Sequence, residues 1–241
     1  MSKMEYFVLS SLVAVGVVSY VFFRPELPPS FSKIPLRENT ATYSISGGYP
    51  SFVNAPNKLN EEIISSIQKR VGEFKRISED NATAWRATRR ADDPLELPYQ
   101  FEMKLDYDVA QATEREISVV LTSYEYSGGA HGMSYTWTVN WDVKNNRAIN
   151  LADVYGGVSD YLYLVSQSIK PKLVDYIASQ VGNPVDDFGM QMIEDGTSPK
   201  IENFSAFSLT PTEITFYFQP YQVGPYSLGE PEITLGRPLL D

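Results

Sequence analysis

The chain has 241 residues and a formal net charge of −10, with no cysteine and a single histidine. The lack of cysteine excludes disulfides, a lipid-modified cysteine and cysteine-ligated zinc. The acidic balance argues against nucleic acid as a partner and favours either a cationic ligand or solubility alone. The aromatic content of 16 Tyr, 12 Phe and 3 Trp is enough for a packed core, in one large domain or two small ones.

The run from Tyr6 to Phe23 contains no charged residue, and as a helix it would span about 27 Å, close to a bilayer's hydrocarbon core. A cleavable signal peptide is the alternative, but the run ends in large residues and Arg24 instead of a small-x-small cleavage site. We therefore expect residues 1–24 to be a membrane anchor that crosses the bilayer with residues 6–23. A slight excess of positive charge before the run predicts a cytoplasmic N-terminus and an extracytoplasmic bulk, periplasmic or extracellular.

Residues 25–37 are rich in proline, which restricts φ and removes donors, so they are predicted to form an extended stalk. Residues 40–46 alternate between polar and apolar and predict a strand that ends at a pair of glycines. Asn60 is a suitable N-cap for an amphipathic helix that runs to about Ser78. The polar residues 79–94 have no clear period and predict a loop.

Residues 99–109 alternate strictly between apolar and charged or polar side chains, which is typical of a strand with one buried face. Residues 116–126 and 135–143 repeat the pattern, so these segments predict an antiparallel meander of three strands. A turn with two asparagines then predicts a hairpin onto residues 148–151.

A second helix is predicted from Ser159 to about Gly182, with Pro171 expected to kink or split it. An irregular acidic segment, a hairpin of residues 204–209 and 213–219, and a short strand at 232–235 complete the pattern. The expected fold class is α+β, with antiparallel sheets, one long helix packed on each of two subdomains, and one transmembrane helix before them. The two subdomains are assigned to residues 38–145 and 146–241.

His131 is the only histidine, so the sequence cannot supply a zinc site with several histidines. The SGGAHG segment that holds His131 has no G-x-S-x-G elbow and no phosphate-loop lysine, which favours a hydrogen-bonded turn histidine over a catalytic base. Adjacent acidic pairs such as Asp92-Asp93 lack calcium-loop spacing and are interpreted as solvated surface. We predict no metal site and no cofactor.

The segment QPYQVGPY after the last long strand joins two Pro-Tyr steps through a glycine. Proline limits the entropy lost when a loop is ordered, and tyrosine offers a large amphipathic contact area, so the segment suits recognition of a partner. A structural turn whose tyrosines pack back onto the sheet is the equal alternative. The predicted ligand- or partner-binding residues are Pro220, Tyr221, Gly224, Pro225, Tyr226 and His131.

Three segments carry a family resemblance: SGGAHG at 127–132, NNRAINLADVY at 145–155 and ITFYFQPYQVGPYSLGEPEITL at 214–235. Together they make the chain similar to the RsiV-like extracytoplasmic domain family, typified by a lysozyme-sensing anti-sigma factor. The first half of this chain also resembles the N-terminal region of the peptidoglycan deacetylase PdaC. The resemblance, over residues 38–237, implies an envelope-exposed α+β region of two subdomains with no catalysis of its own.

Only Met1–Glu5 precede the apolar run, so we expect no sigma-factor-binding segment, and no separate catalytic domain is expected before Asp241. The leading hypothesis is a binding protein, not an enzyme, that recognises an envelope protein such as a lysozyme-type muramidase, or peptidoglycan. An interaction protein that docks another membrane protein is the alternative, and a hydrolase that uses His131 is a third. The oligomeric state is left open.

Overall fold

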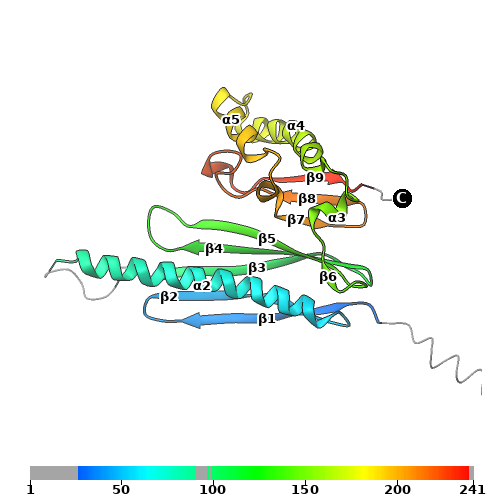
Figure 1. The fold of residues 1–241 in the computed structure, drawn as a ribbon. Coiled ribbons are helices and arrows are strands. Elements are labelled where there is room, and N and C mark those ends of the chain that lie inside the picture. The colour runs from blue at the N-terminus through cyan, green and yellow to red at the C-terminus, as the bar shows by residue number, and fades with distance from the viewer. Residues whose placement is uncertain (1–26, 91–96, 98, 239–241) are drawn as a thin grey trace, which may run out of the picture.

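The computed structural model describes residues 27–90, 97 and 99–238. Two antiparallel-rich sheets and a long helix form a mixed α and β fold, in which the second half of the chain sits on the first (Figure 1). None of the helices in these ranges is long and apolar enough to cross a membrane, and the predicted span 6–23 lies outside them.

The first sheet has six strands in the spatial order β1-β2-β3-β4-β5-β6. The predicted meander is confirmed, since β3, β4 and β5 are neighbours and pair antiparallel. β2 and β3 are parallel instead, because helix α2 lies between them in the chain and returns it to the same end of the sheet. The strands are β1 (Ser30–Asn39), β2 (Tyr43–Val53), β3 (Phe101–Ala112), β4 (Glu116–Tyr126), β5 (Met133–Asp142) and β6 (Arg147–Ala148).

The prediction of a stalk over residues 25–37 is corrected by β1, which pairs with β2 from Ser30 to Asn39. Its proline lies in an edge strand, where a missing N–H is tolerated. β2 also continues through the glycine pair that was expected to end it. Gly47 has φ +124°, and a side chain there would collide with the backbone of Leu105 on β3.

Helix α2 (Asn57–Thr88) is longer than predicted and includes much of the segment interpreted as a loop. The buried residues Leu59, Ile63, Ile67 and Phe74 follow one face of the helix, which packs on the sheet. Asn60 is not the N-cap. Its side-chain amide instead bonds the backbone N–H and C=O of Phe52, each at 2.9 Å, and so joins the helix to β2.

The second sheet has three antiparallel strands in the order β7 (Phe207–Leu209), β8 (Glu213–Tyr217) and β9 (Glu232–Gly236), which confirms the predicted hairpin and last strand. Helix α4 (Tyr161–Val181) ends at Gly182 as predicted, with φ +73°. It is not split by Pro171, which lies inside the helix on its exposed side.

The acidic segment that was expected to be irregular forms helix α5 (Asp187–Gly196), whose first turn is capped by the side chain of Asp186. The remaining elements are the short helix α3 (Leu151–Val154) and the 3-10 turns η1 (Ile201–Phe204) and η2 (Tyr226–Leu228).

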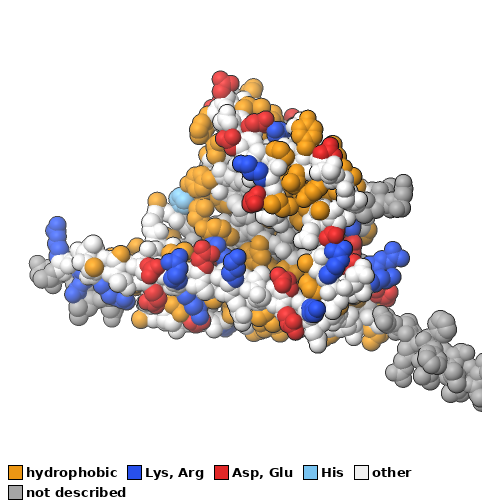
Figure 2. Space-filling model, viewed as in Figure 1, with side chains coloured by type: hydrophobic (Ala, Val, Ile, Leu, Met, Phe, Trp, Pro, Cys, Tyr) orange, Lys and Arg blue, Asp and Glu red, His pale blue; other side chains and the backbone are white. Residues whose placement is uncertain are grey.

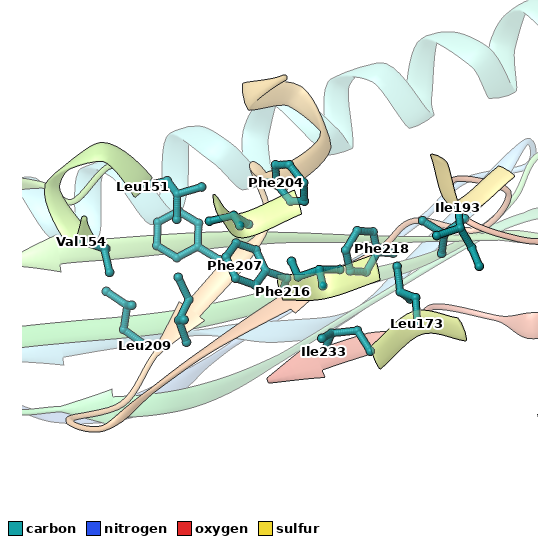
Figure 3. Close-up of a cluster of buried hydrophobic side chains, with 14 of the residues drawn as sticks. Leu151, Val154, Leu173, Ile193, Phe204, Phe207, Leu209, Phe216, Phe218 and Ile233 are labelled. Carbon is teal, nitrogen blue, oxygen red and sulfur yellow. The ribbon is translucent and has the colours of Figure 1, made fainter. Parts of the chain in front are cut away.

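Each half has its own hydrophobic core. In the second half, Phe216 of β8 and Phe218, just after it, pack with Leu173 of α4 and Ile193 of α5 (Figure 3). Hydrophobic side chains also show on the surface of this half, whereas charged side chains of both signs follow the first half (Figure 2).

Buried polar side chains join the two halves on the face of the first sheet opposite to α2. Asn140 donates to the carbonyl of Phe207 at 2.7 Å and accepts from Ser118 at 2.7 Å. The hydroxyl of Ser118 also accepts from the N–H of Leu209 at 2.9 Å. Because these side chains satisfy the backbone of β7, the second sheet has a fixed position on the first.

Candidate functional site

The tip of the β4–β5 hairpin, residues 127–132, is the first component of the site. The Tyr126 hydroxyl donates to the carbonyl of Gly129 at 3.1 Å, and Asn81 of α2 donates to the carbonyl of Ser127 at 2.7 Å. Gly132 packs against the ring of Tyr124, where a Cβ would lie 2.4 Å from the ring. The tip is therefore bonded within itself and to the long helix.

Arg70 of α2 supports the hairpin from behind. It makes a bidentate ion pair with Glu125 of β4, at 2.5 and 2.7 Å, and its guanidinium lies 3.4 Å from the ring centre of Tyr135. Burial acts to lower the pKa of Arg70, but the bonds with Glu125 and Tyr135 outweigh it and raise the pKa. The Arg70 guanidinium thus remains charged over the physiological pH range.

The loop that follows β8 is the second component. The side-chain amide of Gln219 accepts from the N–H of Thr136 at 3.1 Å and donates to its carbonyl at 2.6 Å, as a neighbouring strand would. Gln222 donates to the carbonyls of Gly196 and Asn203, each at 3.0 Å. Between them Tyr221 has φ +69°, an uncommon conformation for a tyrosine, and it turns its side chain outward.

These two components meet in a row of three rings. His131 stacks on Tyr226 with ring centres 3.8 Å apart and planes 23° apart, and the ring centre of Tyr221 lies 5.7 Å from that of Tyr226. The Tyr226 hydroxyl donates to the carbonyl of Gly132 at 2.8 Å. Tyr221 is 51% exposed, and His131 is also exposed. We call His131, Tyr221 and Tyr226 the aromatic surface.

The ring nitrogens of His131 differ in their surroundings. Nδ1 lies 3.0 Å from the carbonyl oxygen of Gly132, and because a carbonyl only accepts, Nδ1 carries the proton of this hydrogen bond. No hydrogen bond from the described part of the chain reaches Nε2, which leaves it available to a ligand.

The structure brings together both segments that the sequence indicated, but it divides the predicted residues. Tyr221, Tyr226 and His131 form the aromatic surface, and Pro225 is exposed beside them. Pro220 and Gly224 are buried, and a Cβ on Gly224 would lie 2.6 Å from Leu228. These two residues shape the loop. Sequence reasoning missed the supporting side chains Gln219, Gln222 and Arg70, since their partners are remote in the chain.

An acidic groove of about 290 Å³ lies beside the loop, between β3 and the second sheet. Thr136 links it to the aromatic surface, because its hydroxyl donates to Glu230 at 3.1 Å while its backbone bonds Gln219. Burial raises the pKa of the Glu230 carboxyl. Within residues 27–90, 97 and 99–238, no group of three or more metal-ligating side chains is placed to hold a metal ion. The groove's carboxylates are those of Asp106, Asp108, Glu230 and Glu232.

Two sheets joined by buried polar side chains, with an exposed aromatic surface at one end, define an α+β protein with a site suited to recognition. Residues 36–134 match the family model described as Deacetylase PdaC, and residues 153–237 match a protein family of unknown function, DUF3298. The chain therefore has one region similar to PdaC and one similar to DUF3298, and these matches confirm the resemblance found in the sequence.

Among curated proteins, the chain is 28% identical over 201 residues to the peptidoglycan-N-acetylmuramic acid deacetylase PdaC of Bacillus subtilis strain 168. The match covers 83% of this chain and 38% of that protein, so the chain spans well under half the length of this relative.

Two crystal structures of DUF3298 family proteins share the fold. The one from Bacteroides fragilis has a TM-score of 0.57 and 18% identity, with 88% of this chain and 92% of that chain covered. The one from Pseudomonas aeruginosa PAO1 has a TM-score of 0.56 and 14% identity, with 88% and 91% covered.

The prediction that the chain is not an enzyme is wrong. Its first half matches a family model named for a deacetylase, and the curated relative is a peptidoglycan deacetylase, which points toward enzymatic activity. Local motifs give no sign of such activity, because the sequence has a single histidine and lacks the G-x-S-x-G and phosphate-loop patterns.

Proposed function

We propose that this chain is a cell-envelope protein that binds peptidoglycan, with the aromatic surface as its contact to the glycan. The observation that carries the proposal is the contact of the exposed His131 and Tyr221 with the half-buried Tyr226 between two segments 94 positions apart, which the Tyr226 hydroxyl bonds together. The similarity to a peptidoglycan deacetylase supports the choice of polymer.

Aromatic rings suit this ligand for a physical reason. The faces of a sugar ring carry C–H groups, which pack on a flat apolar surface, whereas its hydroxyl and amide groups at the rim need hydrogen-bond partners. Tyrosine supplies a large rigid surface with few rotatable bonds, so little entropy is lost on binding. The hydroxyl of the exposed Tyr221 and the Nε2 of His131, which no described residue bonds, would serve as its polar partners.

The cellular setting is part of the proposal. We propose that residues 6–23 anchor the chain in the membrane and that its bulk lies outside the cytoplasm, where peptidoglycan is found. The apolar run supports the anchor, and the match to a peptidoglycan deacetylase supports the location.

The direct test is co-sedimentation of the full chain, in mild detergent, with purified peptidoglycan. We expect the wild type to sediment with the polymer and Tyr221→Ala to bind at least tenfold more weakly. Tyr163→Ala is the matched control, because Tyr163 is 54% exposed on α4 and belongs to a different surface. Equal binding by the wild type and Tyr221→Ala, or no binding at all, would refute the proposal.

A lysozyme-type muramidase is the protein partner predicted from the sequence, and it forms a second arm of this test. Calorimetric titration of the chain with lysozyme, with and without Tyr221→Ala, measures it. If lysozyme gives a heat of binding and peptidoglycan gives none, the ligand of the aromatic surface is a cationic protein and not the glycan.

Deacetylation of peptidoglycan is a second candidate function, favoured by the match of residues 36–134 to the Deacetylase PdaC family model. The test is the release of acetate from N-acetylated peptidoglycan by the full chain over several hours, with and without added divalent cations. Acetate above the level of a heat-denatured sample would support the activity, and acetate equal to that level under every condition would contradict it.

A further inference from the structure

The outer edge of β5 is only partly paired. At its C-terminal end, β6 pairs with Trp141 and Asp142, and the N–H of Ile149 donates to the carbonyl of Asn140 at 2.8 Å. Toward its N-terminal end, the amide of Gln219 pairs with the N–H and the carbonyl of Thr136. One outward-facing residue, Thr138, lies between these two points.

The direction of the Thr138 backbone follows from the register. β4 and β5 pair from Glu116 to Glu125 without a shift, and in an antiparallel ladder every second residue turns its N–H and C=O away from the partner strand. The backbone groups of Thr136 and Asn140 bond partners on the outer side of β5. The N–H and C=O of Thr138, midway between them, therefore point to the same side. Outside the strand ladders, no hydrogen bond from another described residue reaches its N–H or C=O, and its hydroxyl accepts from the N–H of Phe207 at 3.2 Å.

This edge opens into a cavity of about 370 Å³ at the junction of the two halves. The volume lies in the range of small-ligand pockets. Val139, Ile149 and Phe207 are among its apolar walls, and Glu62 of α2 contributes a carboxylate. Glu62 makes no ion pair within the part of the chain that the structure describes.

We propose that this cavity binds a short extended peptide with a basic side chain, which adds to the edge of β5 at Thr138. The Gln219 amide already makes this type of paired bond one step along the same edge. A peptide residue opposite Thr138 would make the same two bonds in the next position. The apolar walls would contact its neighbours, and Glu62 would pair with the basic group.

The neighbouring structure limits the length of the peptide. Gln219 closes one side at Thr136, and Ile149 closes the other at Asn140. Four strand steps span about 13 Å, which leaves room for about three residues. The site is separate from the aromatic surface, and it does not rest on glycan binding.

The probe is N-acetyl-Ala-Lys-Ala-amide, titrated into the full chain by calorimetry, together with three analogues that are each N-methylated at one residue. Strand addition requires one peptide N–H to donate to the carbonyl of Thr138. We therefore expect one analogue to bind at least tenfold more weakly than the parent and the other analogues to bind within about threefold of it. Absence of binding by the parent, or equal affinity for all four peptides, would overturn the proposal.

Ala148→Phe and Glu62→Gln locate the site. Ala148 is exposed and lines the cavity, so a phenylalanine there would fill it without disturbing the core. Ala84→Phe is the matched control, since Ala84 is exposed on α2 and does not line the cavity. We expect Ala148→Phe to abolish binding, Glu62→Gln to weaken it at least threefold and Ala84→Phe to leave it unchanged.

Amide hydrogen exchange gives a readout that a general effect on folding would not produce. The peptide should slow the exchange of the Thr138 N–H at least tenfold in the wild type and not in Ala148→Phe. Binding that persists in Ala148→Phe, or that leaves the exchange of Thr138 unchanged, would overturn the assignment to this edge.

Discussion

Replacing Gln219 by leucine removes the two hydrogen bonds that hold the loop after β8 to β5. The bonds join its amide to the N–H and C=O of Thr136 at 3.1 and 2.6 Å, and Thr136 is 6% exposed. Each hydrogen bond contributes about 0.5–1.5 kcal/mol net, and an unpaired buried group costs about 1–3 kcal/mol. We therefore expect Gln219→Leu to lower the free energy of unfolding by about 2–4 kcal/mol.

Urea denaturation followed by tryptophan fluorescence measures this loss, with an unchanged dependence on urea concentration as evidence of a similar native state. Gln191→Leu is the matched control, because Gln191 is exposed on α5 and makes one hydrogen bond to Asp195. The control should change the free energy by less than about 0.5 kcal/mol. A loss for Gln219→Leu no larger than that of the control would refute the strand-like pairing of Gln219.

Three further predictions concern the ion pairs and hydrogen bonds around the first sheet. The hydrogen bond from Arg237 lowers the pKa of the Glu116 carboxyl below its usual 4.5, so this pair stabilises the fold above that pH and is lost as the pH falls further. Glu116→Gln should therefore reduce stability at pH 7 and flatten its decline in acid, and an unchanged pH profile would contradict this. Glu125→Gln should cost about 2 kcal/mol in thermal or chemical denaturation, because the half-buried Arg70 loses its bidentate partner and keeps only the exposed Glu73 at 3.3 Å; a loss under about 0.5 kcal/mol would argue against a strong pair. A hydrogen bond donated to the Glu38 carboxylate raises the pKa of Tyr43 to about 12, so in an ultraviolet titration Tyr43→Phe should lose one tyrosine that ionises near that pH, and an unchanged titration would contradict this.

Much of the sheet structure could be predicted from local patterns. The strands of the meander were recognised from alternation that is clearest in β3, whereas β4 is buried on both faces from Ile117 to Leu121, between α2 and the second half. β1 could not be recognised in this way, since it is an edge strand with little burial on either face and a proline within it. Helix α5 was missed because its acidic, glycine-containing sequence resembles a loop, and only Ile193 and Gly196 are buried.

The two segments of the candidate site were predicted from the sequence, but the contact between them was not. The Pro-Tyr loop and the histidine turn were each recognised from composition, but nothing local indicates that Tyr226 and His131 stack. Their contact depends on Gln219, whose side chain replaces a neighbouring strand along β5. Such a bond between remote positions leaves no periodic signal, and neither does the free edge at Thr138. The enzymatic connection was missed for a similar reason, since it rests on overall similarity and not on a motif.

The most direct measurement of the central claim is an NMR titration of the full chain with a soluble peptidoglycan tetrasaccharide, observed on the aromatic ring signals. Binding at the aromatic surface predicts that the ring signals of Tyr221, Tyr226 and His131 shift together with one dissociation constant, while those of Tyr163 on α4 do not move. Ring signals of the aromatic surface that remain unchanged at saturating glycan would contradict the claim.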